Sequence, residues 1–228
     1  MPEEIIFNKP RKDVLLRLKQ SRIIFFDLDG TLTPVKSVWR FLHEHLGTEE
    51  AAAINRKLFF ESKIDYKKWA ELDALLWKGM PVYRLHKILD KIPLRDGANE
   101  LITFFKKRGY ILVLISGGIS LLADRFKNIG FDYVVSNELI TDTDDVLTGS
   151  VNVRVTQNNK GNIARNICRR LNISMKYAVA IGDSYSDMSL FNVVNVSIAV
   201  DKELLREKSI DIILSLIHIS EPTRLGMI

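Results

Sequence analysis

The chain has 228 residues, 46% of them hydrophobic, which is enough for a buried core but short for several large domains. Its single cysteine, Cys168, excludes an internal disulfide framework and favours a reducing cytoplasm. The formal net charge is +5, but Lys and Arg alternate with Asp and Glu and form no polybasic run. The N-terminal residues lack the long apolar stretch of a signal peptide or membrane span. We therefore expect no nucleic-acid and no membrane partner.

The first predicted strand, RIIFF at residues 22–26, ends at two acidic residues. Residues i and i+2 of an extended chain point to the same side, so Asp27 and Asp29 are expected to share a site. Two carboxylates at one site repel each other unless a cation or a shared proton holds them. A hard divalent ion with oxygen ligands resolves this repulsion, and Mg²⁺ is the simplest one.

The next segment, residues 36–92, predicts an all-helical insert. Its four amphipathic stretches begin with residues suited to a helix N-cap or first turn, namely Ser37, Thr48, Asp65 and Pro81. The insert is too long for a simple crossover between strands. We expect a mobile helical cap, with residues 1–35 and 93–213 forming the core beneath it.

The second predicted strand, YILVLI at residues 110–115, leads into Ser116, Gly117 and Gly118. A hydroxyl and exposed backbone amides beside a helix predicted at 119–128 suit a phosphate group. The β-rich runs at residues 137–155 surround a polar turn and predict a hairpin. Lys160 follows, ahead of a helix predicted at 162–171, where it can supply a balancing positive charge.

The third predicted strand, YAVAI at residues 177–181, ends before a second acidic pair, Asp183 and Asp187. A short helix at 187–191 and edge strands in SIAV and IDII complete the pattern, which indicates an α/β fold with a Rossmann-like parallel sheet. Ligands bind at the carboxyl ends of such strands, so the acidic pairs, the serine-glycine segment and Lys160 should face one crevice. The set is typical of phosphoryl transfer, where positioning and charge stabilisation dominate catalysis.

Four ordered motifs resemble those of the haloacid dehalogenase superfamily. They are DLDGT at 27–31, ISGG at 115–118, Lys160, and GDSYSD at 182–187 followed by MSLF. Within the superfamily the chain resembles subfamily IB, the phosphoserine phosphatase-like branch, whose helical cap follows the first motif. The resemblance implies a Mg²⁺-dependent phosphatase, a phosphoric monoester hydrolase acting on a small phosphorylated metabolite.

The resemblance also implies a role for each motif residue. Asp27 would be the nucleophile that forms an aspartyl-phosphate, and Asp29 would protonate the leaving oxygen and then activate water. The implied metal ligands are Asp27, Asp29 through its backbone carbonyl, Asp183, and Asp187 as ligand or support. The implied phosphate-binding residues are Ser116, Gly117 and Lys160.

One position departs from phosphoserine phosphatases. Lys36 stands where those enzymes carry a glutamate that binds the amino group of the substrate. This cation argues against phosphoserine and favours a substrate with an additional negative charge. We therefore expect Lys36, Trp39 and Arg40 to influence specificity, with Arg56 and Arg84 as further cations of the cap.

Other functions fit part of the same pattern. A phosphotransferase or mutase of the family would use the same residues, and a non-catalytic protein could bind a phosphate or another anion there. A response-regulator receiver also combines acidic residues with a lysine, but it is shorter and has no helical insert. The sequence is compatible with a monomer or a homodimer.

The last stretch, LSLIHISEPTRLGMI at 214–228, matches the in-frame translation of a sequencing-library adapter. We therefore expect the native sequence to be interrupted near Ile213 and exclude the stretch from fold reasoning.

Overall fold

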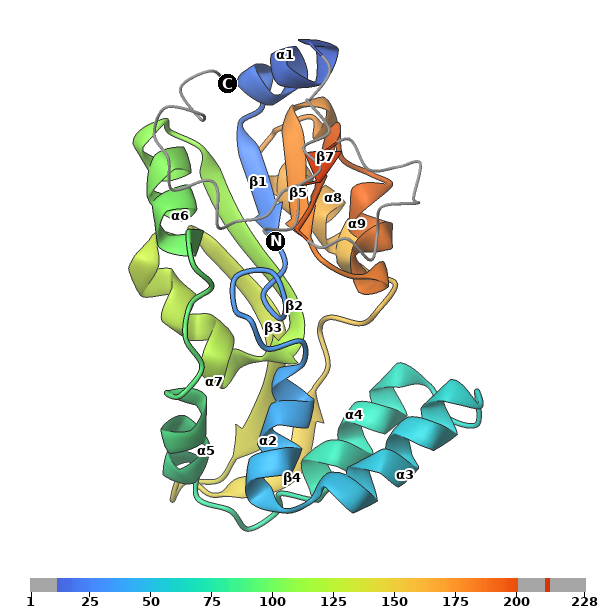
Figure 1. Ribbon diagram of the computed structural model, residues 1–228. Coiled ribbons are helices and arrows are strands. Elements are labelled where there is room, and N and C mark those ends of the chain that lie inside the picture. The colour runs from blue at the N-terminus through green and yellow to red at the C-terminus, as the bar shows by residue number, and fades with distance from the viewer. Residues whose placement is uncertain (1–11, 201–211, 214–228) are drawn as a thin grey trace, which may run out of the picture.

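A mostly parallel sheet forms the centre of the computed structural model, which describes residues 12–200 and 212–213 (Figure 1). Its strand order is β4-β3-β2-β1-β5-β6-β7. The strands are β1 Ile23–Phe26, β2 Ile111–Ile119, β3 Tyr133–Thr141, β4 Leu147–Asn152, β5 Ala178–Gly182, β6 Val196–Ala199 and β7 Ile212–Ile213. Neighbouring strands run parallel except β3 and β4, which are antiparallel. The expected fold class is confirmed, while the adapter-like stretch lies outside the described residues.

Strand β1 lies at the middle of the sheet and is fully buried. Its alternate side chains enter different cores: Ile24 and Phe26 pack on one face of the sheet, and Ile23 and Phe25 on the other. Each buried side chain of this size stabilises the fold by about 1.5–3 kcal/mol. The strand ends at Asp27, whose N–H still bonds to β5. Apolar packing on both faces therefore fixes the place of the first acidic residue.

Helices cover both faces of the sheet (Figure 1). Residues of α6 and α7 belong to one core, and residues of α8 and α9 to the other. The core helices are α1 Lys12–Gln20, α6 Ala98–Lys107, α7 Ser120–Ala123, α8 Lys160–Arg170 and α9 Met188–Phe191, with 3-10 turns η1 Asp124–Ile129, η2 Met175–Tyr177 and η3 Tyr185–Asp187. Among the described residues, no helix has the length and apolar character needed to span a bilayer.

The predicted helix at 119–128 is only partly correct. Strand β2 continues to Ile119, so the helix starts one residue later as the short α7 and turns into the 3-10 helix η1 after Ala123. Gly130, with φ 121°, ends η1. The segment with Ser116 therefore belongs to the irregular end of a strand, where the pairing with β3 shifts.

The insert between β1 and β2 contains α2 Val38–Leu46, α3 Glu49–Phe60, α4 Tyr66–Leu75 and α5 Val82–Leu89. Ser37 and Asp65 cap α2 and α4 through side-chain oxygens that accept backbone N–H groups. Thr48 precedes α3 but forms no such cap, because its Oγ1 bonds to His43 and Trp77 instead. The exact division between cap and core remains a prediction.

The predicted hairpin is formed by β3 and β4, and it extends from the sheet behind α2 to the cap (Figure 1). The N–H of Gly79 donates to the Leu147 carbonyl at 2.8 Å, and the N–H of Leu147 donates to the Met80 carbonyl at 2.9 Å. A third bond runs from the Val82 N–H to the Asp145 carbonyl at 2.9 Å. Opening of the cap must therefore carry the hairpin with it or bend the cap between α4 and α5.

Candidate active site

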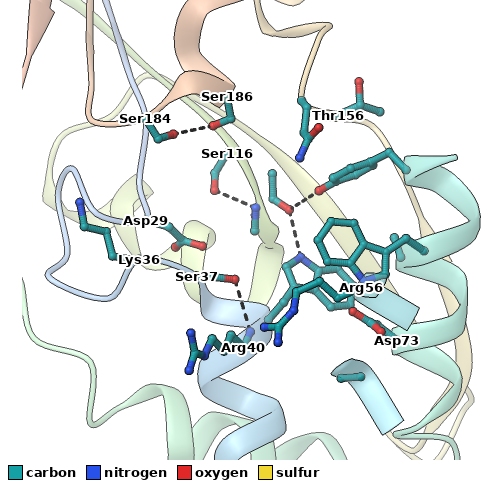
Figure 2. Close-up of a pocket in the computed structure, with 18 of the residues that line it drawn as sticks. Asp29, Lys36, Ser37, Arg40, Arg56, Asp73, Ser116, Thr156, Ser184 and Ser186 are labelled. Carbon is teal, nitrogen blue, oxygen red and sulfur yellow. Dashed lines mark hydrogen bonds between the residues drawn. The ribbon is translucent and has the colours of Figure 1, made fainter. Parts of the chain in front are cut away.

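The ends of β1 and β2 and the start of α8 meet at a cavity of about 310 Å³, which helices α2, α3 and α4 of the cap enclose from the other side (Figure 2). The cavity therefore lies where the strand pattern predicted a crevice, between core and cap. The sequence-predicted residues that line it are Asp27, Asp29, Lys36, Trp39, Arg40, Arg56, Ser116, Gly117, Gly118 and Lys160. Asp183 and Asp187, which were expected to face the same crevice, do not line it.

Lys160 places its ammonium group between two carboxylates. Its Nζ lies 2.6 Å from Asp27 Oδ1 and 2.7 Å from Asp187 Oδ1, and the side chain is 2% exposed. Burial disfavours the ammonium, but the charges of Asp187 and Asp27 outweigh it and raise the pKa of Lys160. A Cβ on Gly161 would lie 2.1 Å from the Ser189 carbonyl oxygen, so this glycine lets α8 approach α9 closely. Lys160 is the first residue of α8 rather than a residue ahead of it.

The first acidic pair is held in two different environments. Burial, and then the negative charge of Asp187, raise the pKa of Asp27 well above its usual range despite the contact with Lys160. Burial also raises the pKa of Asp29 to about 6, although Asp29 Oδ2 accepts the Val38 N–H at 2.8 Å. Asp29 Oδ1 is buried and has no hydrogen-bond partner among the described residues. This unpaired oxygen can take a proton or contact a ligand in the cavity.

Three carboxylates form a cluster suited to a cation. Oxygens of Asp27, Asp183 and Asp187 lie within 4.8 Å of one another, and all three residues are buried. Two glycines make this approach possible: a Cβ on Gly30 would lie 2.2 Å from Asp183 Oδ2, and one on Gly182 would lie 2.6 Å from Asp187 Oδ2. An all-oxygen donor set with excess negative charge fits a hard divalent ion such as Mg²⁺. The Asp29 carboxylate is outside the cluster.

The serine-glycine segment is buried beside this cluster. Ser116 is 1% exposed, and its Oγ accepts the Gly118 N–H at 2.9 Å (Figure 2). The Gly117 carbonyl points toward the cap, where it accepts hydrogen bonds from the Trp39 indole and the Tyr66 hydroxyl. The segment therefore contacts the cap with one side, while the Ser116 hydroxyl lines the cavity.

The cations of the cap differ in what they contact. Lys36 Nζ lies 2.9 Å from Asp183 Oδ2, so it approaches the acidic cluster. Arg40 Nε lies 2.8 Å from Glu44 Oε1, so Arg40 forms an ion pair with Glu44. Arg56 lines the cavity, and its guanidinium forms no hydrogen bond or ion pair with any residue in 12–200 or 212–213, whereas Arg84 does not line the cavity.

Sequence reasoning missed a buried polar group in the cap wall. Asp73 is 4% exposed; its Oδ1 accepts the Asn55 amide at 2.9 Å, and its Oδ2 lies 3.5 Å from His43 Nε2. The signal was an acidic residue four positions after Trp69 and four before Trp77, on a face that is otherwise apolar. Such a residue in a helix needs buried partners.

The chain resembles known phosphatases over most of its length. Residues 24–192 match the family model of haloacid dehalogenase-like hydrolases, a range that includes all four motifs. The phosphoserine phosphatase of Methanocaldococcus jannaschii is 32% identical over 194 residues, which cover 84% of this chain and 91% of that protein.

Two solved structures share the fold. A phospho-aspartyl intermediate analogue of phosphoserine phosphatase has a TM-score of 0.71 and 31% identity, covering 85% of this chain and 93% of that one. A substrate-bound phosphoserine phosphatase complex has a TM-score of 0.73 and 28% identity, covering 91% and 97%. The similarity therefore includes the cap as well as the sheet.

Proposed function

The chain is a phosphatase of the haloacid dehalogenase-like hydrolase family, and we propose that it hydrolyses a small phosphomonoester through an aspartyl-phosphate, an acyl phosphate on Asp27, with Mg²⁺ as cofactor. One observation carries the proposal: the buried Asp27 carboxylate, which lines the cavity, contacts Lys160 at 2.6 Å and belongs to an acidic cluster with Asp183 and Asp187. We also propose a cytoplasmic location, because the one cysteine, Cys168, is free and buried.

In the first step, an oxygen of Asp27 bonds to phosphorus while the bond from phosphorus to the leaving oxygen breaks. Asp29 donates its proton to that oxygen; a pKa of about 6 keeps a fraction of Asp29 protonated near neutral pH. Asp29 then accepts a proton from the water that attacks the phosphorus, which restores Asp27 and releases phosphate.

The other residues of the site bind and shield the phosphoryl group. Ser116, the Gly117 amide and Lys160 would bind its oxygens. Mg²⁺ would be held by Asp27, Asp183 and the Asp29 carbonyl, with Asp187 in support, and would neutralise charge on the transferred group. The closed cap would exclude water while the aspartyl-phosphate forms. A cavity of about 310 Å³ suits a small metabolite and would exclude a phosphoprotein.

We expect the purified chain to release phosphate from small phosphomonoesters in the presence of Mg²⁺ and to lose this activity when the metal is chelated. A panel of phosphate esters, with free phosphate measured, checks this. Transfer of labelled phosphate to an added sugar, without release, would contradict hydrolysis and identify a transferase. Phosphate binding without any turnover would identify an anion-binding protein.

Arg56 supports a finer expectation about the substrate. A guanidinium without an ion pair in the cavity wall can bind a carboxylate in a bidentate manner. We therefore expect phosphoglycolate to be preferred over ethyl phosphate, which replaces the carboxylate with a methyl group. Arg56→Gln should lower kcat/KM about tenfold or more for phosphoglycolate and only slightly for ethyl phosphate.

Arg84→Gln is the matched control, since Arg84 is an exposed residue of α5 outside the cavity. This variant should leave kcat/KM unchanged for both substrates. An equal loss of kcat/KM on both substrates with Arg56→Gln would show that Arg56 does not recognise the carboxylate of phosphoglycolate.

A further inference from the structure

The Gly117 carbonyl oxygen accepts three hydrogen bonds from three separate elements. Trp39 Nε1 of α2 lies 3.0 Å away, the Tyr66 hydroxyl of α4 lies 3.2 Å away, and Asn137 Nδ2 of β3 lies 2.9 Å away. Two donors therefore belong to the cap and one to the core. A carbonyl has two lone pairs, so this oxygen is fully saturated when the cap is closed.

The core donor is fixed in place. Asn137 is fully buried, and its Oδ1 accepts the N–H groups of Arg154 and Val155 at 2.8 and 2.9 Å. Its Nδ2 also donates to the Val155 carbonyl at 3.0 Å. Because Asn137 cannot follow the cap, the bonds from Trp39 and Tyr66 are the ones that depend on cap position.

The same peptide unit reaches the Ser116 hydroxyl. The planar peptide between Gly117 and Gly118 carries the carbonyl on one side and the Gly118 N–H on the other, so both turn together. That N–H donates to Ser116 Oγ at 2.9 Å. Since Oγ accepts there, the hydroxyl hydrogen of Ser116 is directed elsewhere, and Ser116 lines the cavity. Holding the carbonyl therefore also holds the orientation of this hydroxyl.

The two glycines allow the cap to come this close. A Cβ on Gly118 would lie 2.8 Å from Val38 Cγ1, and a Cβ on Gly117 would lie 3.2 Å from the Tyr66 hydroxyl. The nearest neighbour of each Cβ belongs to the cap, although a Cβ on Gly118 would also lie 3.0 Å from Ser116 Oγ in the core. The close approach and the hydrogen bonds thus point to the same interface.

We propose that Trp39 and Tyr66 are positioning residues, which transmit closure of the cap through the Gly117–Gly118 peptide to the Ser116 hydroxyl and so tighten phosphate binding. This inference rests on the proposed function, because it assumes that Ser116 binds phosphate. Burial raises the pKa of Tyr66 to about 12, so its hydroxyl remains a donor at neutral pH. Trp39 then acts through the backbone rather than by selecting the substrate.

Tyr66→Phe tests the inference most cleanly, because it removes one hydroxyl and keeps the ring. Trp39→Phe removes the indole donor, and Tyr83→Phe is the matched control, an exposed tyrosine of α5. Calorimetric titration of the full chain with inorganic phosphate, with Mg²⁺ present, should show affinity about three- to tenfold lower for Tyr66→Phe and Trp39→Phe. The control should bind phosphate like the wild type.

A second readout separates positioning from a merely structural role. The indole N–H signal of Trp39, assigned by its loss in Trp39→Phe, should exchange with solvent more slowly when phosphate binds, and Tyr66→Phe should weaken this protection. A structural role would lower the melting temperature and leave phosphate affinity and exchange unchanged.

Failure of this inference and failure of the proposed function give different experimental results. A wild-type protein that turns over phosphomonoesters, combined with unchanged phosphate affinity in both variants, overturns the inference alone. A wild type that neither binds nor releases phosphate overturns the inference and the proposed function together.

Discussion

Asp27→Asn is expected to reduce phosphate release by roughly 10⁴-fold or more, because the amide cannot attack phosphorus as the carboxylate does. The variant should nevertheless fold. The ionised Asp27 is costly in the native state, since burial raises its pKa, and an amide removes that cost. Lys160 keeps its second contact, the 2.7 Å bond to Asp187. We therefore expect a melting temperature in metal-free buffer at least equal to that of the wild type.

Asp124→Asn is the matched control for this experiment. Asp124 is half-exposed in η1, pairs only with Lys127 among the interactions described, and does not line the cavity. Its phosphate release and melting temperature should equal those of the wild type. Turnover that survives in a well-folded Asp27→Asn protein would exclude Asp27 as nucleophile.

Lys160→Met is expected to have the largest effect on stability. The substitution keeps an unbranched apolar side chain in place of the lysine stem but leaves Asp27 and Asp187 buried without the cation between them. Removing one partner of a buried ion pair costs about 3–5 kcal/mol. Urea unfolding at neutral pH, without metal, should show a loss of this size together with loss of activity.

The loss should depend on pH in a defined direction. Lys160 lowers the pKa of Asp27. Without Lys160, the pKa of Asp27 in the folded protein therefore rises further above its value of 3.8 in the unfolded chain. A carboxyl group whose pKa is higher in the folded than in the unfolded state stabilises the fold while it is protonated. This contribution to the free energy of unfolding is lost as pH rises through the folded-state pKa. Lys160→Met should therefore be destabilised less at pH values near the unfolded pKa of Asp27 than at alkaline pH.

Lys127→Met controls for the loss of a lysine charge, because Lys127 forms an exposed pair with Asp124. It should change the free energy of unfolding by less than about 1 kcal/mol at either pH. A Lys160→Met protein as stable as this control at alkaline pH would contradict the account of the buried charges.

The sequence predicted the core side of the cavity because topology fixes it. Once β1, β2 and β5 are parallel neighbours, the residues after their carboxyl ends must meet at one edge. That rule brings Asp27, Ser116 and Asp183 together without any knowledge of packing. Lys160 was predicted from its place in the pattern, although α8 starts at Lys160 itself, two residues before the predicted start at 162.

The cap side could not be predicted in the same way. The bonds from Trp39 and Tyr66 to the Gly117 carbonyl depend on how two helices dock on a strand far away in the chain. Local spacing carries no information about that docking. Glycines allow both a loop and an irregular strand end, so the continuation of β2 through Gly117 and Gly118 to Ile119 was also missed. Thr48 is a residue type suited to an N-cap, yet its hydroxyl forms hydrogen bonds with His43 and Trp77 instead.

The proposed reaction transfers phosphate to Asp27 and then to water. Acid quenching of the full chain during turnover of a labelled phosphomonoester with Mg²⁺, followed by peptide mapping, tests it most directly. The account predicts covalent phosphate on the peptide containing Asp27, labile to hydroxylamine and absent from Asp27→Asn. Turnover with no covalent phosphate, or with phosphate on another residue, would contradict it.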